Sequence, residues 1–330
     1  MTHRLLLASI VLIASQLGQA ASPDQLRQDF MAMMVAKHGF EPAELKRILW
    51  QARTQKSILE AIARPAERIK PWWEYRKGFL TKARIKGGLA FWRDNQEILR
   101  RAEQKYGVPP EVIVGILGVE TNYGTYPLRH SVLDALHTLG FHYPKRGKFF
   151  RSELKHFLLL AREEGLDPTQ VKGSYAGAMG KPQFMPSSYR RLAIDFDGNG
   201  TRDIWHNNVD VIGSIAYYLS RNGWQGGEPI AVRIANIQPQ HEEFVDARLR
   251  LPHTVAELRR AGIGLPSHWK DPAKVSLIKL QGRDETQYWA RLQNFRSILS
   301  YNPRNKYAMA VYQLGDAIKR VRQQQARNDR

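Results

Sequence analysis

The sequence of 330 residues contains no cysteine. It therefore has neither a disulfide framework nor a thiol for lipid attachment. Beyond its N-terminus it also lacks an apolar run long enough to cross a bilayer. Carboxylates are scarce, with 31 Asp and Glu against 50 Lys and Arg, which gives a net charge of +19. These shortages exclude a disulfide-stabilised domain and an integral membrane protein, and they leave a basic globular chain with room for several subdomains.

The excess of positive charge indicates a polyanionic partner or surface. Nucleic acid, anionic lipid and an acidic cell-wall polymer would each fit. The basic residues are dispersed along the sequence without a long Lys/Arg block, which is the pattern least typical of sequence-specific nucleic-acid binding. We therefore expect no nucleic-acid partner.

Met1–Ala20 has the pattern of a secretory signal peptide. His3 and Arg4 form a short basic start, an apolar core follows, and small residues precede a predicted cut near Ala20/Ala21. The apolar core is too short to span a bilayer comfortably. We predict an exported, soluble protein without a membrane anchor.

The stretch Pro109–Gly124, PPEVIVGILGVETNYG, predicts a buried helix that ends in a single carboxylate. Pro109 and Pro110 favour a first helical turn, and the residues that follow are apolar on nearly every side. Glu120 then stands alone at the helix end. Loss of water around such a carboxyl group raises its pKa, which suits a general acid. The alternative is an ordinary solvated helix-end residue, and this stretch by itself leaves both interpretations open.

Glycines mark two further places where the backbone is expected to turn or pack closely. Gly115 and Gly118 would weaken a free helix, but they let another backbone or a ligand approach. Gly173–Ser188, GSYAGAMGKPQFMPSS, suits neither a long helix nor a long strand, so we predict a shaped loop. This loop lacks the Lys-Ser/Thr ending of a phosphate-binding P-loop.

Pro71–Phe79, PWWEYRKGF, combines aromatic and basic residues. It could belong to the edge of the core or to a surface on which sugar rings stack. For Trp72 and Trp73 we favour the core.

Asp195–Asp210, DFDGNGTRDIWHNNVD, has the spacing of a calcium loop. Its first, third, fifth, sixth and seventh positions are, in order, Asp195, Asp197, Asn199, Gly200 and Thr201. The twelfth position is His206 rather than the usual Glu, which leaves Asp203 and Asp210 as substitutes. A cation site is favoured over an ion-free turn, in which the Asp and Asn side chains would only bind nearby backbone N–H groups.

Hydrophobic periodicity predicts a mainly α (α+β) chain. Helices are expected within Pro23–Tyr106, including one from Pro42 to just before Pro65, and at Ser131–Leu139, Gly147–Glu164, Val211–Arg221 and Tyr307–Gln325. Alternating residues predict a small antiparallel sheet from Ile230–Ile234, Phe244–Leu251 and Val275–Leu280, with a helix at Val255–Ala261.

Three motifs in a fixed order, GILGVETNYG, GSYAGAMGKPQFMPSS and YNPRNKYAMAVYQLG (Tyr301–Gly315), together with the calcium-like loop, resemble the lytic transglycosylase B family of bacterial cell-wall enzymes. The resemblance extends from about Phe30 to the last helix. It implies a lysozyme-like helical core with a flanking helical region and a small antiparallel β subdomain. The implied division is a signal peptide (1–20), a helical region (21–97), a catalytic core (98–228) containing the calcium loop (195–210), a β-rich subdomain (229–290) and a closing C-terminal segment (291–330).

The resemblance implies cleavage of the β-1,4 bond between N-acetylmuramic acid and N-acetylglucosamine in peptidoglycan, with formation of 1,6-anhydromuramoyl ends. Glu120 matches the family's acid/base. The implied substrate-binding residues are Tyr75, Ser174, Gln183, Tyr218, Tyr301, Asn302 and Tyr307, with Lys145 and Arg146 facing the acidic stem peptide. The implied metal ligands are Asp195, Asp197, Asn199, Thr201 and Asp210.

The same resemblance implies a soluble periplasmic protein with a structural calcium ion and no organic cofactor. Its partners would be peptidoglycan glycan strands, and cell-wall synthesis proteins are further candidates.

The number of carboxylates near Glu120 in the sequence also bears on the reaction type. Two-carboxylate glycosidases need a second Asp or Glu within about 5–10 Å of the acid. No second carboxylate occurs in the motif around Glu120, and Asp134 and Glu153 lie on helices where a structural role suffices. With one carboxylate, the muramoyl C6 hydroxyl can attack its own anomeric carbon in place of water. A hydrolytic muramidase and a non-catalytic peptidoglycan-binding protein remain the alternatives.

Overall fold

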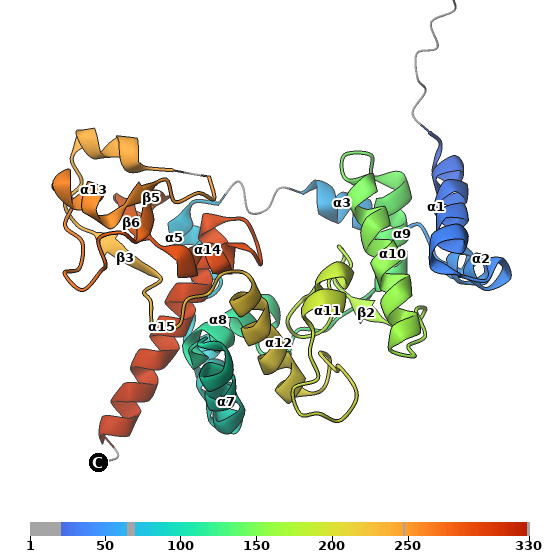
Figure 1. Cartoon of the computed structure of the whole chain (residues 1–330), viewed down its shortest axis with the longest axis horizontal. Coiled ribbons are helices and arrows are strands. Elements are labelled where there is room, and N and C mark those ends of the chain that lie inside the picture. The colour runs from blue at the N-terminus through green and yellow to red at the C-terminus, as the bar shows by residue number, and fades with distance from the viewer. Residues whose placement is uncertain (1–20, 65–69, 247, 329–330) are drawn as a thin grey trace, which may run out of the picture. The chain divides into compact units, whose positions relative to one another are not determined.

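The computed structural model describes residues 21–64, 70–246 and 248–328 (Figure 1). The predicted signal peptide lies outside these residues. The chain divides into two compact units, one ending at Arg47 and one formed by Ile48–Arg330. Each unit is described by itself.

The first unit contains α1 (Pro23–His38) and the start of α2 (Pro42–Gln51). The Ser22 hydroxyl accepts from the backbone N–H of Gln25 and begins α1. Gly39, in the left-handed region at φ 60°, ends it. Both ends of α1 are thus determined by local residues, a Ser-Pro pair at the start and a glycine at the end.

The helix expected to run from Pro42 to Pro65 is interrupted, and that prediction was wrong. The structure has α2 and then α3 (Lys56–Ala63), with extended backbone between them. Side chains of α9 (Val132–His142) accept hydrogen bonds from backbone N–H groups in the segment between α2 and α3. The N–H of Arg53 donates to Asp134 (2.8 Å), and the N–H of Gln55 donates to the Thr138 hydroxyl (3.0 Å). These bonds replace those that a continuous helix would make.

Helix α8 (Pro110–Thr121) is the buried element of the second unit, as its apolar sequence predicts. It packs backbone to backbone against α15 (Asn305–Asn328). A Cβ on Gly115 would lie 2.6 Å from the carbonyl oxygen of Val311, and one on Gly315 would lie 2.3 Å from that of Glu111. Glycine is therefore required at both positions, and the close approach expected at Gly115 is confirmed. The helices that contact this pair are α5 (Trp72–Lys77), α6 (Lys82–Asp94), α7 (Gln96–Tyr106), α12 (Asn208–Arg221) and α14 (Gln293–Leu299). Helix α10 (Gly147–Glu163) packs instead against α9 and α11 (Pro186–Leu192).

The β-rich part is a four-stranded antiparallel sheet in the order β3-β6-β5-β4, drawn in orange beside α13 (Val255–Arg260) in Figure 1. The strands are β3 (Ala231–Ile234), β4 (His253–Thr254), β5 (Lys274–Gln281) and β6 (Thr286–Arg291). They bury a small core of their own that includes Phe244, Leu258, Trp269 and Leu277.

The strand predicted at Phe244–Leu251 is absent from the described residues, and β6 was not predicted. A short 3₁₀-helix (Pro239–Phe244) is followed by irregular chain. The buried guanidinium of Arg291 accounts for this, because it donates to the carbonyls of Asp246 (3.0 Å), Arg248 and Arg250 (3.3 Å). The Arg291 side chain thus forms hydrogen bonds with the backbone carbonyls that would otherwise pair with a neighbouring strand.

A two-stranded ribbon of β1 (His130–Ser131) and β2 (Lys172–Gly173) leads into the glycine-rich segment. That segment is a loop only as far as Met185, because α11 begins at Pro186. Helix α12 begins at Asn208, earlier than predicted, because the Asn207 side chain accepts from the N–H of Val209. Asp210 therefore lies in the first turn of a helix.

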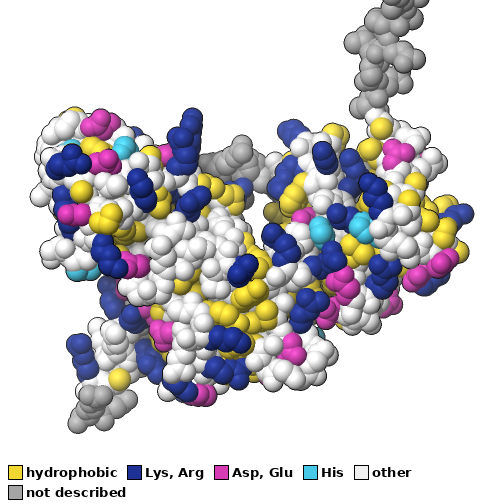
Figure 2. Space-filling view, viewed as in Figure 1, with side chains coloured by type: hydrophobic (Ala, Val, Ile, Leu, Met, Phe, Trp, Pro, Cys, Tyr) yellow, Lys and Arg dark blue, Asp and Glu magenta, His cyan; other side chains and the backbone are white. Residues whose placement is uncertain are grey.

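None of the described helices is both long enough and apolar enough to cross a membrane. Lys and Arg side chains are spread over most elements of the face drawn in Figure 2, with acidic side chains between them. This distribution agrees with the dispersed charge of the sequence.

Candidate active site

Glu120 lies in the last turn of α8, as predicted. The phenol of Tyr307, on α15, donates to its Oε1 at 2.5 Å. Burial raises the pKa of Glu120 to about 7, and the hydrogen bond from Tyr307 opposes this rise. No other carboxylate among the described residues contributes to the shift. Near neutral pH the side chain can therefore both give and take a proton.

Three further tyrosines lie near this carboxyl group. Burial, together with the negative charge of Glu120, raises the pKa of Tyr75 to about 12 and holds that of Tyr301 well above its ordinary value. The rings of Tyr218 and Tyr301 are 4.4 Å apart, and the Tyr218 hydroxyl donates to the carbonyl of Ser300 at 2.7 Å. The Tyr301 hydroxyl is buried without a hydrogen-bond partner in the described chain. It is a donor left available beside the acid.

The glycine-rich loop reaches this group through Phe184. Its ring lies 5.4 Å from that of Tyr218 and 5.9 Å from that of Tyr301. Gln183, next to it, takes the left-handed conformation at φ 54° and donates from Nε2 to the carbonyl of Gly180. Ser174 lies at the other end of the loop, where its hydroxyl accepts from the N–H groups of Ala176 and Ala178. Ser174 thus shapes the loop.

Backbone strain is concentrated at the two motifs. Among the described non-glycine residues, positive φ occurs at Asn122 (50°), Tyr123 (62°) and Gln183 (54°). Such conformations cost about 1–3 kcal/mol each and persist only where surrounding contacts enforce them. For Tyr123 those contacts include a 2.8 Å hydrogen bond from its hydroxyl to the carbonyl of Arg84.

Lys145, Arg146 and Asn302 are not joined to Glu120 by any contact within the described residues. Arg146 is exposed, and its guanidinium lies 4.3 Å from the ring centre of Phe149. Lys145 is exposed beside it. The carbonyl of Asn302 accepts from the N–H of Arg304, which shapes the turn before α15.

Sequence reasoning missed Arg84. This buried side chain donates to the carbonyl of Gly118 and to the Tyr126 hydroxyl (2.5 Å), and so braces the end of α8 from behind. Nothing local distinguishes it from the other basic residues. Phe184 was also missed, although it stands inside a motif that the sequence did single out.

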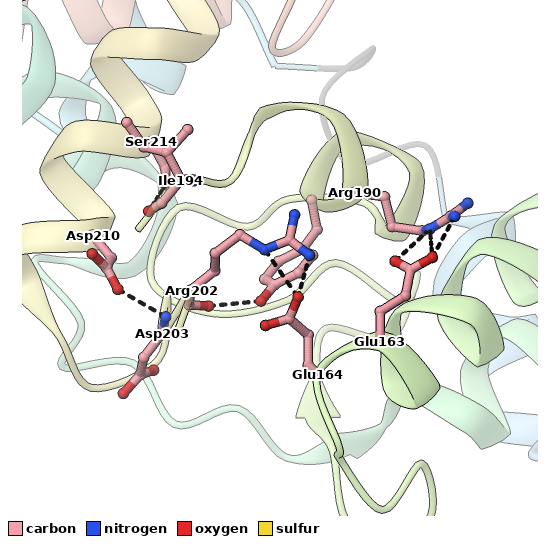
Figure 3. Close-up of polar contacts among 9 residues, drawn as sticks. Glu163, Glu164, Arg190, Ile194, Arg202, Asp203, Asp210 and Ser214 are labelled. Atoms are coloured by element: carbon pink, nitrogen blue, oxygen red, sulfur yellow. Dashed lines mark hydrogen bonds and ion pairs between the residues drawn. The ribbon is translucent and has the colours of Figure 1, made fainter. Parts of the chain in front are cut away.

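The predicted cation loop brings three carboxylates together. One oxygen from each of Asp195, Asp197 and Asp210 can lie within 4.8 Å of the others. Hydrogen bonds from the N–H of Gly200 and its neighbours hold the pKa of Asp195 below its usual range. Asp210 is fully buried and accepts from the N–H groups of Phe196 (2.7 Å) and Asp203 (2.9 Å); Figure 3 shows it pointing at Asp203.

Asp210 thereby completes the cluster in place of the missing glutamate. Asp203, the other substitute considered, instead accepts from the N–H groups of Trp205 and His206. Asn199 joins the turn by accepting from the N–H and hydroxyl of Thr201. Oxygen donors of this kind, with a buried carboxylate among them, fit a hard cation such as calcium.

Two ion pairs fasten this region to the end of α10 (Figure 3). Arg202 pairs with Glu164, and Arg190 pairs with Glu163 at 2.6 Å. The loop therefore has a defined geometry relative to the helices around it.

The sequence matches the family described as Transglycosylase SLT domain over residues 22–316. The membrane-bound lytic murein transglycosylase B of Escherichia coli (strain K12) is 41% identical over 318 residues, which cover 94% of this chain and 87% of the relative. The soluble lytic transglycosylase SltB1 from Pseudomonas aeruginosa is 46% identical with a TM-score of 0.84, covering 89% of this chain and 98% of that chain. The Escherichia coli lytic transglycosylase Slt35, solved in complex with calcium, is 40% identical with a TM-score of 0.81, covering 95% and 99%.

The chain belongs to the transglycosylase SLT domain family. It is a lytic transglycosylase, an enzyme that cleaves peptidoglycan and leaves anhydromuramoyl ends. The expected fold class, mainly α with a lysozyme-like core and small antiparallel sheets, is confirmed as well.

The two other candidate carboxylates, Asp134 and Glu153, both accept hydrogen bonds from the protein itself. Asp134 accepts from the backbone of Arg53 and from the amide of Gln55 (3.2 Å). Glu153 is buried and accepts from the N–H (2.9 Å) and hydroxyl (2.8 Å) of Ser187. Both have the structural roles that their helices suggested.

Proposed function

We propose that Glu120 is the single acid/base of the transglycosylase reaction. Protonated Glu120 donates its proton to the oxygen of the scissile glycosidic bond as that bond breaks. The resulting carboxylate then accepts the proton of the muramoyl C6 hydroxyl as that oxygen attacks the anomeric carbon of its own sugar. Glu120 thus gives one proton and regains one, and no water is consumed.

The observation that supports this most is the pairing of a half-buried carboxyl of raised pKa with a tyrosine donor. Glu120 has a pKa of about 7 and accepts from Tyr307 without a neighbouring carboxylate to serve as nucleophile. The Tyr307 hydrogen bond stabilises the carboxylate that forms after the first proton transfer. The positive charge at the sugar ring is met by the substrate's own N-acetyl oxygen.

We assign the cleft residues in line with this role. Tyr75, Tyr218 and Tyr301 lie near the acid and suit contact with sugar rings. Lys145 and Arg146 would face the acidic stem peptide. The remaining cleft residues are Ser174, Gln183, Asn302 and Tyr307.

Replacing Glu120→Gln tests the assignment. Digestion of peptidoglycan should fall by several orders of magnitude while cooperative folding and muropeptide binding persist. Glu60→Gln, an exposed residue on α3, is the matched control and should digest like wild type. If Glu120→Gln digested peptidoglycan at the wild-type rate, the assignment would be wrong.

The loop Asp195–Asp210 is proposed to bind a structural calcium ion, in keeping with the calcium complex of the relative Slt35. The ion would be held by Asp195, Asp197, Asn199, Thr201 and Asp210, and it would offset the mutual repulsion of their carboxylates. Binding to the folded state alone raises stability by about 2.7 kcal/mol at a hundredfold excess over Kd.

Millimolar calcium should therefore raise the melting temperature. Asp195→Ala should cancel most of that rise, whereas Asp316→Ala, which removes an exposed carboxylate of α15, should leave it intact. Identical melting curves in calcium and in chelator would count against the site.

We propose that the enzyme is exported, is processed near Ala20/Ala21 and acts on peptidoglycan in the periplasm. The Escherichia coli relative is named membrane-bound, so cell fractionation is the relevant test. Recovery of a soluble periplasmic chain that begins near Ala21 supports the proposal. Recovery of the uncut chain from the cytoplasm would overturn it.

A further inference from the structure

A cavity lies beside α5, and Glu120 is not among its lining residues. Its volume is about 640 Å³. One wall is α5 with the residues that follow it, and the other is the turn between β5 and β6. The lining residues that matter here are Trp72, Trp73, Arg76, Lys77, Arg283 and Asp284. We call this cavity the α5 groove.

The α5 groove and the carboxyl of Glu120 lie on different sides of one short helix, α5. Tyr75 is close enough to Glu120 for that charge to raise its pKa. Consecutive helix residues are rotated by about 100°, so Trp73 and Lys77, four residues apart, share a different face. A ligand that extends past Tyr75 therefore needs to cross only the width of α5 to enter the groove.

The groove carries cations that have no carboxylate partner within the described chain. The Lys77 Nζ lies 4.7 Å from the ring centre of Trp73, and the Arg283 guanidinium lies 6.0 Å from it. Neither forms an ion pair there, and Arg76 forms none either. Glu285, the second acidic residue of the turn, is paired with Arg233. Asp284 is thus the one carboxylate of the lining without an ion pair among the described residues.

Buried donors in the same wall also lack acceptors. The Nε1 of Trp72, a fully buried side chain, has no hydrogen-bond partner in the described chain, and neither does the buried Nε of Arg76. Buried polar groups are nearly always paired, and leaving one unpaired is costly. The described chain therefore supplies fewer acceptors than this wall has donors.

We propose that the α5 groove binds the acidic stem peptide of a muramoyl residue held in the glycan cleft, a different residue from the one whose stem peptide faces Lys145 and Arg146. Arg76, Lys77 and Arg283 would receive the peptide carboxylates, and Asp284 would receive its free amine. A bare glycan is a poorer match, because Lys77 covers a face of Trp73 on which a sugar ring would stack. This inference rests on the proposed function, since it takes peptidoglycan as the ligand of the adjoining cleft.

The test compares two probes on the Glu120→Gln protein, which binds without turnover. One is a tetrasaccharide of alternating N-acetylglucosamine and N-acetylmuramic acid with its stem peptides, and the other is the same tetrasaccharide without them. Adding Lys77→Gln and Arg283→Gln should weaken calorimetric binding of the peptide-bearing probe by about a hundredfold, tenfold for each cation. Binding of the peptide-free probe should not change.

Lys279→Gln is the matched control, because it removes a charge from strand β5 at a residue whose ion pair is with Glu242, outside the groove. It should leave both affinities unchanged. If the double substitution left the affinity for the peptide-bearing probe unchanged, the proposal that the α5 groove binds the stem peptide would be wrong. The assignment of the glycan cleft would not be affected. Failure of both probes to bind the Glu120→Gln parent would overturn the groove and the cleft together.

A second measurement requires no change in the groove. In protein labelled with ¹⁵N-tryptophan, the peptide-bearing probe should shift the indole resonances of Trp72 and Trp73, and the peptide-free probe should shift them much less. Identical shifts with the two probes would contradict the proposal. This result decides the matter even if the double substitution unfolds the protein.

Discussion

The phenol of Tyr307 donates a 2.5 Å hydrogen bond to Oε1 of Glu120, although 187 positions separate the two residues. The bond exists because α15 lies directly on α8, which Gly115 and Gly315 permit. The protonation of Glu120 is thus controlled by a contact between two helices and by burial.

The pH dependence of activity follows from this contact. In the proposed mechanism the reaction begins with protonated Glu120, so kcat/KM should decline as pH rises past the pKa of about 7. Tyr307→Phe removes a hydrogen bond that lowers this pKa, so the decline should move to higher pH. Digestion rates measured across the pH range, with Tyr312→Phe of the same helix as control, check this. A decline that stays in place or moves to lower pH would contradict the assigned hydrogen bond.

Stability should depend on pH through the same group. The folded-state pKa of about 7 exceeds the ordinary value of 4.5, so the folded protein binds more protons between these values. Stability is therefore lost as pH rises through that window. Glu120→Gln should be more stable than wild type above the window by about 1–3 kcal/mol, and this advantage should vanish below it. Urea unfolding at both ends of the window measures the difference, and a gap independent of pH would refute the burial of the charge.

The α8–α15 contact should be intolerant of even one methyl group. Gly115→Ala would place a Cβ 2.6 Å from the carbonyl oxygen of Val311 and should destabilise the protein by about 1–3 kcal/mol or more. Gly264→Ala is the control, because nothing lies within 4 Å of its Cβ. Comparable melting temperatures for the two variants would show that the helices can separate without cost.

Lys181 links the loop Asp195–Asp210 to the end of helix α8. Its Nζ donates to Asn208 (2.6 Å) at the start of α12, and its N–H donates to the carbonyl of Ile204 (2.9 Å). Its own carbonyl accepts from the hydroxyl of Thr121 (2.9 Å), the residue after Glu120.

Lys181→Met should therefore displace the end of α8 and lower kcat by about tenfold or more, with little change in KM. Lys181→Arg, which keeps a donor, should recover part of the loss, and Lys86→Met on the exposed face of α6 should have no effect. A change confined to KM would indicate a substrate contact in place of a positioning role.

Elements with strong local signals could be predicted from the sequence. Helix α8 begins after Pro109 and ends at Asn122 because proline and a left-handed residue determine its ends locally. The strand expected at Phe244–Leu251 failed because Arg291, distant in sequence, takes its carbonyl groups. No pattern within the segment could reveal that competition.

In the candidate site, too, some residues have a local sequence signal and others depend on distant contacts. Glu120 was identifiable because it is the single carboxylate that follows a long apolar run. Its partner Tyr307 came only from the resemblance to a family, since the contact depends on how α15 packs. Arg84, which braces the helix end, gave no local signal because its role arises from burial alone.

In the proposed mechanism one carboxylate directs the C6 hydroxyl, and not water, to the anomeric carbon. Digestion of peptidoglycan in ¹⁸O-labelled water, followed by mass spectrometry of the muropeptides, tests it most directly. We predict anhydromuramoyl ends without ¹⁸O from the wild-type enzyme, and no new ends from Glu120→Gln. Reducing muramic acid ends that carry ¹⁸O as the main product would contradict the account, because water would then be the nucleophile.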